Sequence, residues 1–267
     1  MVTGAAACVL ATTTVGATAQ RVVSMWHSPI VRLGPNQSSN WSGYNQGTLE
    51  QGGKLFTSVS GTWRVPKATP HKAGEAEYSS TWIGIGGGCV DQDCNVGDST
   101  LIQAGTEQDV DASGKASYSA WWELIPAPSI TIDGFAVHAG DLISASIKET
   151  PANSGLWTIS VKNVTTGRPF TQTVPYSSTH ATAEWIVETP VVIDDSGNVS
   201  IGPLPKLSQV RFDKATTNGA APGLKASEEI QLVDPNTDAV LATPSAPDGQ
   251  KNGFADCTYA KSCPTPR

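Results

Sequence analysis

The sequence is poor in charge, and above all in positive charge. Only 15% of its 267 residues are charged, and 17 Lys and Arg stand against 24 Asp and Glu, which gives a net charge of −7. Because no basic run could neutralise phosphates, this composition argues against a nucleic-acid partner. The chain has four histidines, and no two of them stand at ligand spacing, so we expect no metal site and no cofactor.

Long apolar runs are equally scarce. The run Ala5–Val15 leads into Ala17-Thr18-Ala19, which has the small-x-small form of a signal peptidase site, although no Lys or Arg precedes it. We therefore predict a signal peptide with a shortened front end over residues 1–19; a buried N-terminal helix is the alternative. Because no other stretch reaches the length of a membrane span, the mature protein is predicted to be secreted, extracellular and free of the membrane.

Cysteine usage agrees with export. Removal of the signal would take Cys8 and leave an even number of cysteines. The four that remain form two close pairs: Cys89 with Cys94, and Cys257 with Cys263. We predict a local disulfide in each pair. Cross-pairing or a metal site stays open as an alternative, although neither pair has C-x-x-C spacing or a nearby histidine.

Gly, Ser, Thr and Val recur along the chain, a composition that suits sheets and turns. Candidate strands follow one another at intervals of about 8–12 residues with hairpin-type turns between them, and two of them are expected at 54–60 and 61–65. This pattern predicts an all-β protein, an antiparallel β-sandwich in one domain over residues 38–267. Residues 20–37 are irregular and are predicted to be a pro-segment or an N-terminal arm. We expect a monomer.

Two extended segments carry unusual polar residues. In the segment 183–188 (AEWIVE), Glu184, Ile186 and Glu188 share one face of a strand. In the segment 101–105 (LIQAG), Gln103 takes an inward position where its amide must find partners. We interpret Gln103 and Glu184 as a catalytic pair.

A hairpin brings a third polar residue to this pair. The turn Asp111–Gly114 joins the Gln103 strand to a return strand over 116–124, in which Trp121 and Glu123 share a face. Because the two strands are hairpin neighbours, we expect Glu123 to lie beside Gln103 across the ladder.

Seven sequence blocks, in order, resemble those of the glutamic peptidases (eqolisins, family G1), and the resemblance covers nearly the whole mature chain. The blocks are 39–43 (SNWSG), 61–66 (GTWRVP), 82–85 (WIGI), 101–105 (LIQAG), 120–123 (AWWE), 163–167 (NVTTG) and 183–188 (AEWIVE). The resemblance implies a sandwich of two curved antiparallel sheets, a jelly roll of the concanavalin A or lectin type. It also implies a secreted acid endopeptidase that acts on polypeptides.

The same resemblance implies that Gln103 and Glu184 are the catalytic dyad. Substrate-binding or supporting positions are then expected at Trp41, Trp82, Glu107, Trp121 and Glu123. Two positions depart from the pattern of the fungal members, which usually have aspartate where Gly86 and Glu107 stand here. The first departure could loosen the hydrogen bonds around the dyad, whereas the second keeps the charge.

The chemistry of this pair is self-consistent. A glutamate can deprotonate water as a general base and then, once protonated, act as the acid for the leaving amine, while the glutamine NH2 stabilises the oxyanion. A serine triad would have to recruit His180, but no Gly-x-Ser-x-Gly elbow is present. The main alternative is a β-sandwich glycoside hydrolase or a carbohydrate-binding, lectin-like module that uses Glu184 and Glu188. In glycosidases with an E-x-D-x-E strand the middle residue is aspartate, whereas here it is Ile186.

Overall fold

Strands make up nearly all the regular structure. The computed structural model describes residues 24–193, 197 and 199–266, so the signal peptide predicted for residues 1–19 lies outside the described residues. Within the described ranges the one helical element is a 3-10 turn, η1 (Ala226–Glu228). None of the helical structure described is long and apolar enough to cross a membrane.

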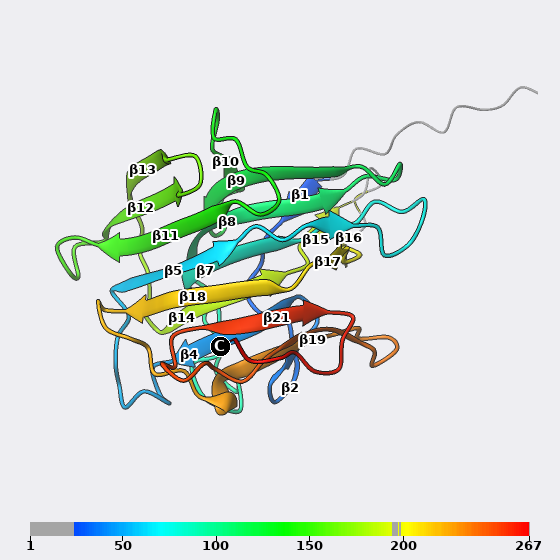
Figure 1. The fold of residues 1–267 in the computed structure, drawn as a ribbon. Coiled ribbons are helices and arrows are strands. Elements are labelled where there is room, and N and C mark those ends of the chain that lie inside the picture. Colours follow the sequence, from blue (N-terminus) through cyan, green and yellow to red (C-terminus); the bar gives the residue numbers. More distant parts are fainter. Residues whose placement is uncertain (1–23, 194–196, 198, 267) are drawn as a thin grey trace, which may run out of the picture.

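The strands form a sandwich in which two antiparallel sheets lie face to face (Figure 1). The first sheet has the order β10 (Ile130–Thr131), β9 (Ala116–Leu124), β8 (Leu101–Val110), β7 (Ser80–Gly86), β14 (Thr182–Glu188), β4 (Trp41–Gly47) and β19 (Glu229–Val233). The second has the order β20 (Val240–Pro244), β21 (Phe254–Thr258), β18 (Val210–Thr217), β5 (Ser58–Arg64), β11 (Leu142–Glu149), β12 (Leu156–Asn163) and β13 (Arg168–Pro175). The predicted all-β sandwich is therefore confirmed.

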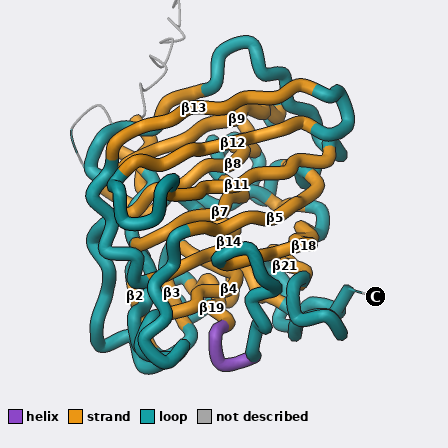
Figure 2. The backbone as a smooth tube through the Cα atoms, turned by 90° about the vertical axis from the view of Figure 1, so that its left-hand side faces the viewer, coloured by secondary structure: helices purple, strands orange, loops and turns teal. Residues whose placement is uncertain are grey.

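The two sheets are continuous at one edge. Strand β19 pairs with β4 of the first sheet and with β20 of the second, so the chain folds over at β19. Figure 2 shows β19 and β4 at the base of the molecule, with strands of both sheets crossing the view above them. Shorter pairs complete the fold: β1 (Ser24–Trp26) with β15 (Val191–Ile193) and β16 (Val199–Ile201), β2 (Arg32–Gly34) with β3 (Gln37–Ser38), and β6 (Ala68–Thr69) with β17 (Lys206–Leu207).

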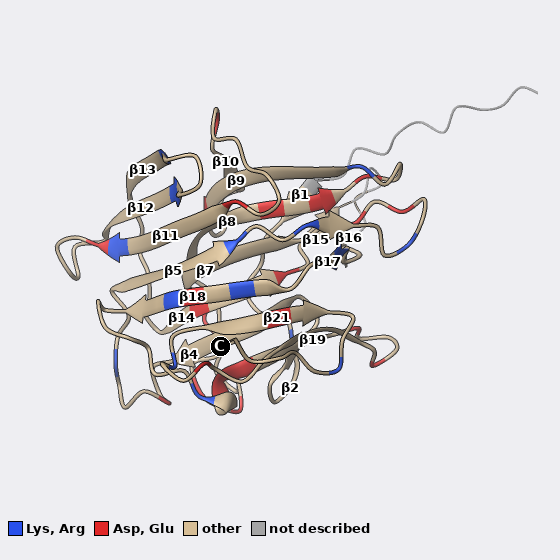
Figure 3. Cartoon of the chain, viewed as in Figure 1, with Lys and Arg blue, Asp and Glu red and all other residues tan. Residues whose placement is uncertain are grey.

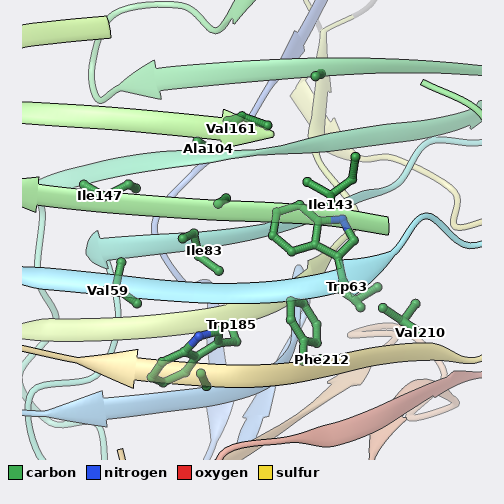
Figure 4. Packing of buried hydrophobic residues seen from close by; sticks show 14 of the residues in the cluster. Val59, Trp63, Ile83, Ala104, Ile143, Ile147, Val161, Trp185, Val210 and Phe212 are labelled. Atoms are coloured by element: carbon green, nitrogen blue, oxygen red, sulfur yellow. The ribbon is translucent and has the colours of Figure 1, made fainter. Parts of the chain in front are cut away.

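The main core lies between the sheets, because alternate residues of each strand point inward. Ile83 on β7 and Trp185 on β14 meet Val59 and Trp63 of β5 in one apolar cluster (Figure 4). We call this side of the first sheet its inner face. A second, smaller cluster covers the opposite side, the outer face, and consists of Trp41, Trp82, Leu101, Trp121, Ile186 and Ile230.

One predicted strand break is wrong. The stretch expected to form strands at 54–60 and 61–65 is a single strand, β5, which pairs with β11 without a register shift. Gly61 continues this strand because its missing side chain gives room to Trp185. A Cβ added to Gly61 would lie 3.0 Å from Cδ1 of that indole. The glycine therefore marks close packing between the sheets rather than a turn.

The segment before the sandwich lies on the outer face of the first sheet. Strand β1 pairs antiparallel with β15 from Ser24↔Ile193 to Trp26↔Val191, and β2 pairs with β3. Between these two strands the chain crosses the outer apolar cluster, where Ile30 is half-buried. We call residues 24–31 the cover segment.

Both predicted local disulfides are present. Cys89 is bonded to Cys94 in the loop that follows β7, and Cys257 of β21 is bonded to Cys263 near the C-terminus. The first closes a loop that touches the outer face of the first sheet, whereas the second lies on the second sheet.

Candidate active site

Sheet register puts Gln103 and Glu184 in one row across three strands. Gln103 on β8 pairs with Gly84 on β7, and Gly84 pairs with Glu184 on β14. Since neighbouring strands are roughly 4.8 Å apart, the Cα atoms of Gln103 and Glu184 are separated by about 10 Å. The residue between them has no side chain. A Cβ on Gly84 would lie 2.8 Å from the Trp82 ring, 3.0 Å from Leu101 Cδ1 and 3.3 Å from Glu184 Oε2, so the glycine lets these side chains close over the strand between the two functional groups.

The same row extends to one further strand on each side. Gln103 pairs with Glu123 on β9, and its Nε2 donates a hydrogen bond of 2.7 Å to Glu123 Oε2. This confirms that the two residues are neighbours across the hairpin. On the other side Glu184 pairs with Asn45 of β4, whose side chain accepts from the Cys89 N–H at 3.0 Å and donates to the Cys89 carbonyl at 2.8 Å. Asn45 thus holds the first disulfide loop against the row.

Several polar atoms of this row have no partner. Gln103, Glu123 and Glu184 are completely buried, yet both carboxylate oxygens of Glu184, Oε1 of Gln103 and Oε1 of Glu123 lack a hydrogen bond within the described part of the chain. Unsatisfied buried groups are costly and therefore rare in folded proteins. Their concentration in one row is typical of a site whose polar groups are directed at a ligand rather than at the fold.

Burial controls the protonation of the row. It raises the pKa of Glu184 well above the ordinary carboxyl value, and the charge of Asp98 raises it further. Burial also raises the pKa of Glu123 to about 7, against the opposing effect of His27 and the Gln103 hydrogen bond. Both side chains therefore bind a proton more tightly than an exposed carboxyl group does.

Farther along the strands, tryptophan and glutamate side chains line the outer face. Trp82 on β7 and Trp121 on β9 lie on either side of Gly105 in the next row. The indole of Trp82 donates to Glu188 Oε2 at 2.8 Å, and it makes an edge contact with Trp41 at a centroid distance of 4.9 Å. The row after that contains Glu107, Ser80, Glu188 and Trp41. The structure thus brings together all five expected supporting residues on the outer face.

His27 of the cover segment packs among these glutamate and tryptophan side chains. Its Nδ1 lies 2.9 Å from Glu188 Oε2 and its Nε2 lies 2.9 Å from Glu107 Oε1, while its ring stacks on Trp121 at 3.8 Å with an interplanar angle of 7°. Burial alone would lower the pKa of His27, but the carboxylates of Glu188 and Glu107 outweigh it and raise that pKa well above the ordinary value. Sequence analysis missed this residue because it is 161 positions from Glu188 and 80 from Glu107.

The structure also explains the glycine at position 86. Gly86 has a φ of +94°, and a Cβ at this position would lie 2.1 Å from the Thr100 carbonyl oxygen. An aspartate could not adopt this backbone without displacing the following loop. The acidic group near the dyad is instead Asp98, which accepts from Thr100 and from the hydroxyl of Thr179. No periodicity in the sequence distinguishes Asp98 from other loop aspartates.

His180, the candidate for a serine triad, lies outside this row. Its Nε2 lies 2.9 Å from Glu149 Oε2 on the second sheet, and its ring contacts Trp157. Glu149 also accepts from the backbone of Asn153 and Gly155, so the group holds a hairpin turn. In the ranges 24–193, 197 and 199–266, no cluster of three or more His, Cys, Asp or Glu side chains is arranged to hold a metal ion.

Comparisons with known proteins agree with this geometry. A search of the curated protein sequences finds no match. Among solved structures, scytalido-glutamic peptidase with a transition state analog inhibitor aligns with a TM-score of 0.58 at 22% identity, covering 82% of this chain and 98% of that chain. Aspergilloglutamic peptidase from Aspergillus niger aligns with a TM-score of 0.52 at 24% identity, covering 68% of this chain and 99% of its own.

At these identities the structural matches show a common fold. A sequence profile adds the family, because that of the Peptidase A4 family matches residues 39–254, a range that contains Gln103, Gly84 and Glu184. The resemblance drawn from the sequence blocks is thereby confirmed. The chain belongs to the Peptidase A4 family, that of the glutamic peptidases.

Proposed function

We propose that this member of the family is a secreted acid endopeptidase in which Gln103 and Glu184 form the catalytic dyad. The observation that carries the proposal is the row Gln103–Gly84–Glu184, in which a glycine separates two buried side chains that have unpartnered polar atoms. An amide donor and a carboxyl group in one row can act on a peptide carbonyl and one water molecule once the side chains that pack over Gly84 give way to the substrate.

Hydrolysis then needs a base, an oxyanion donor and an acid. Glu184, in its ionised form, takes a proton from water as the oxygen attacks the peptide carbonyl. The NH2 of Gln103 donates to the oxyanion that develops. Glu184 next gives its proton to the departing nitrogen, which leaves as an amine while the new carboxyl group forms. A raised pKa favours this second step, because the protonated glutamate persists near the leaving group.

Glu123 is the positioning residue for the amide. One N–H of the Gln103 NH2 group is held by Glu123 Oε2, so the other N–H remains available to the oxyanion. A carboxyl group can accept this bond through its carbonyl oxygen even when protonated. The orientation of the amide should therefore persist in acid.

Peptides are the ligands that we expect the outer face to bind. One structural relative was crystallised with a peptide-based transition state analog, and another, SCP-B of the eqolisin family, with the tripeptide Ala-Ile-His. By analogy we expect polypeptide substrates to lie across β14, β7 and β8. Two disulfides fit an extracellular site of action. We expect the protein to act as a monomer.

Replacement of the dyad tests the proposal. Glu184→Gln removes the base, and Gln103→Ala removes an oxyanion donor whose loss costs about 10²–10³-fold in kcat. Both variants should fold and lose activity on denatured casein at acidic pH. Glu149→Gln is the control, because it makes the same chemical change to a buried glutamate on the other sheet. Near-normal turnover by either dyad variant would refute the assignment, and cleavage of β-glucan instead of casein would indicate the glycosidase alternative.

Inhibitors separate this mechanism from other peptidase classes. Pepstatin complements paired aspartates, chelators remove metals and fluorophosphonates react with activated serines, so none of them should act on this dyad. Strong inhibition by EDTA would indicate a metalloenzyme instead.

A further inference from the structure

The outward side of the second sheet is rich in hydroxyl and basic residues. Along β18, β5, β11, β12 and β13 alternate residues point away from the core, whereas the residues between them, such as Val59 and Ile147, belong to the main apolar cluster. Hydroxyl groups occupy many of the outward positions: Ser58, Ser60, Thr62, Ser144, Ser146, Thr158, Ser160, Thr171, Thr173 and Thr216. We call the outward positions of these strands the hydroxyl face.

Sheet register aligns hydroxyl groups in one row across the whole face. Thr216 of β18 pairs with Ser60 of β5, Ser60 with Ser146 of β11, Ser146 with Ser160 of β12, and Ser160 with Thr171 of β13. Hydroxyl groups at both ends of the row share hydrogen bonds, of 2.7 Å between Ser60 and Thr216 and of 3.3 Å between Ser160 and Thr171. Since neighbouring strands are roughly 4.8 Å apart, the row is about 19 Å long. An extended polymer with repeated hydroxyl groups can form hydrogen bonds along such a row.

A hollow lies at the β18 end of this row. Its volume is about 330 Å³, and its lining includes Ser60, Ser146, Lys148 and Thr216. Strand β18 is irregular beside the hollow, because its pairing with β5 shifts register between Asp213 and Thr216, and an irregularity of this kind bends a strand locally. One end of the row therefore has room to seat a sugar ring.

The hydroxyl face is positively charged, although the protein as a whole carries a net charge of −7. Its exposed charged side chains are one carboxylate, Asp213, and the cations Arg64, Lys148, Lys162 and Arg211 (Figure 3). Lys148 lies two residues beyond Ser146, and Lys162 lies two residues beyond Ser160. The two lysines are on opposite sides of the row, because β11 and β12 are antiparallel. Each is about 7 Å from the row along its strand.

We propose that the hydroxyl face binds an acidic polysaccharide, a polyuronate, that lies along the row with its carboxylates toward the flanking lysines. Serine and threonine both donate and accept hydrogen bonds, as sugar hydroxyls do, and an ammonium group forms charge-assisted hydrogen bonds with a carboxylate. The proposal does not rest on the proposed function. The main core separates this face from the row of Gln103 and Glu184, so polysaccharide and peptide can be bound at the same time.

Other polyanions fit this face less well. Single-stranded nucleic acids stack their bases on aromatic side chains, and the outward positions of these strands include no aromatic residue. Binding to a membrane surface draws on apolar side chains that enter it, and here leucine occurs only at strand ends, as Leu142 and Leu156. The centre of the face carries hydroxyl groups instead, which favours a polymer rich in hydroxyl groups.

The test measures binding of the full chain to immobilised polygalacturonate by biolayer interferometry. The comparison probes are dextran, phosphatidylserine vesicles and single-stranded DNA, all at about pH 5, where carboxyl groups of ordinary pKa are largely ionised. We expect binding to polygalacturonate that weakens as salt is added, and at least tenfold weaker binding to each of the other probes. No binding to polygalacturonate would overturn the proposal. Equal or tighter binding to vesicles or DNA would overturn the choice of polysaccharide, and equal binding to dextran would overturn the role of charge.

Charge variants locate the site. Lys148→Glu combined with Lys162→Glu should weaken binding to polygalacturonate at least tenfold. The matched control is Lys72→Glu combined with Lys115→Glu, which changes the net charge equally at exposed loop positions outside the hydroxyl face, and it should change the affinity less than threefold. An equal loss in the two pairs would mean that binding follows net charge alone, and would overturn the site.

Removal of hydroxyl groups tests the row itself. Ser146→Ala combined with Ser160→Ala should weaken binding about 3–10-fold, because each side chain loses a hydrogen bond to the polymer. Unchanged affinity would overturn the role of the row. Casein cleavage should equal that of the wild type in all these variants, because the dyad lies on the other sheet. A protein that binds polygalacturonate through Lys148 and Lys162 yet cleaves no casein would support this site and refute the proposed function.

Discussion

The two faces of the sheet β9-β8-β7-β14-β4 are built from alternate residues of the same strands, yet they differ in kind. The inner face presents Ile83, Ile102, Ala104, Trp185 and Val187 to the opposite sheet, all of them buried and apolar. The outer face is buried almost as deeply, but its central row consists of carboxyl and amide groups. Figure 3 shows acidic positions on β8 and basic ones on β18 of the second sheet.

This difference leads us to associate residues of the inner face with folding and residues of the outer row with the proposed chemistry. Inner positions contribute transfer free energy and packing. Outer positions such as Glu184 bury ionisable atoms without partners, which costs stability and raises their pKa values. We therefore expect substitutions on the inner face to act on unfolding, and those on the outer row to act on turnover and on the pH dependence of stability.

The largest effect should follow from Trp185→Ala on the inner face. The change removes a fully buried indole and its hydrogen bond of 2.8 Å to the Ser60 carbonyl. We expect the free energy of unfolding to fall by about 3–5 kcal/mol, measured by urea denaturation. An equal loss in Trp121→Ala, whose ring stacks on His27 of the cover segment, would remove the distinction between the faces.

The next effect concerns Glu123 and pH. Its pKa is raised from about 4.5 to about 7 in the folded protein. The folded state therefore binds this proton more tightly than the unfolded state, and stability is lost as pH rises between these values. The loss should be on the order of 3 kcal/mol, and Glu123→Gln should remove it. A wild-type melting temperature that does not change between pH 4 and 8 would contradict the assignment.

Gly84→Ala should disturb chemistry more than folding. A methyl group would crowd the ends of the Trp82, Leu101 and Glu184 side chains, which can give way slightly. We expect a loss of about 1–2 kcal/mol in stability and, through displacement of the dyad, about 10²-fold in kcat/KM. The control is Gly61→Ala on the inner side of β5, which crowds Trp185 and should cost stability while leaving turnover unchanged.

The smallest effect belongs to the exposed side of the second sheet. Thr158 and Thr173 share a hydrogen bond of 3.1 Å between hydroxyl groups on neighbouring strands. Thr158→Ala should change the free energy of unfolding by less than about 0.5 kcal/mol and leave activity unchanged. A larger change would mean that the two outward sides of the sandwich are less different than their burial indicates.

Strand alternation was enough to predict part of the site. It gave the shared face of Glu184, Ile186 and Glu188, and the hairpin turn gave the pairing of Gln103 with Glu123. Both are local properties of the chain. The row that joins β8 to β14 through Gly84 depends on which strands become neighbours, and periodicity carries no information about that. The sequence therefore predicted that Gln103 and Glu184 act together only through the resemblance of its blocks to those of the glutamic peptidases.

Other features were beyond sequence reasoning for physical reasons. The predicted boundary between strands at 54–60 and 61–65 is wrong because the indole that occupies the space beside Gly61 comes from Trp185 on the other sheet, which local sequence does not reveal. His27 lies in a stretch with no periodic pattern, and its importance comes from carboxylates on β8 and β14. Contacts across such sequence distances are set by the tertiary fold, so local patterns do not reveal them.

The pairing of β1 with β15 also affects the order of folding. Its two strands are far apart in the chain, with Ser24 opposite Ile193, and contacts of such long sequence separation are slow to form because a large loop must close first. Moreover, His27, which follows β1, contacts Glu188 of β14 and Glu107 of β8, so the cover segment can dock only after these strands have come together. We therefore expect each folding molecule to pass through a short interval in which the outer face is complete and exposed to solvent, before the cover segment lies across it.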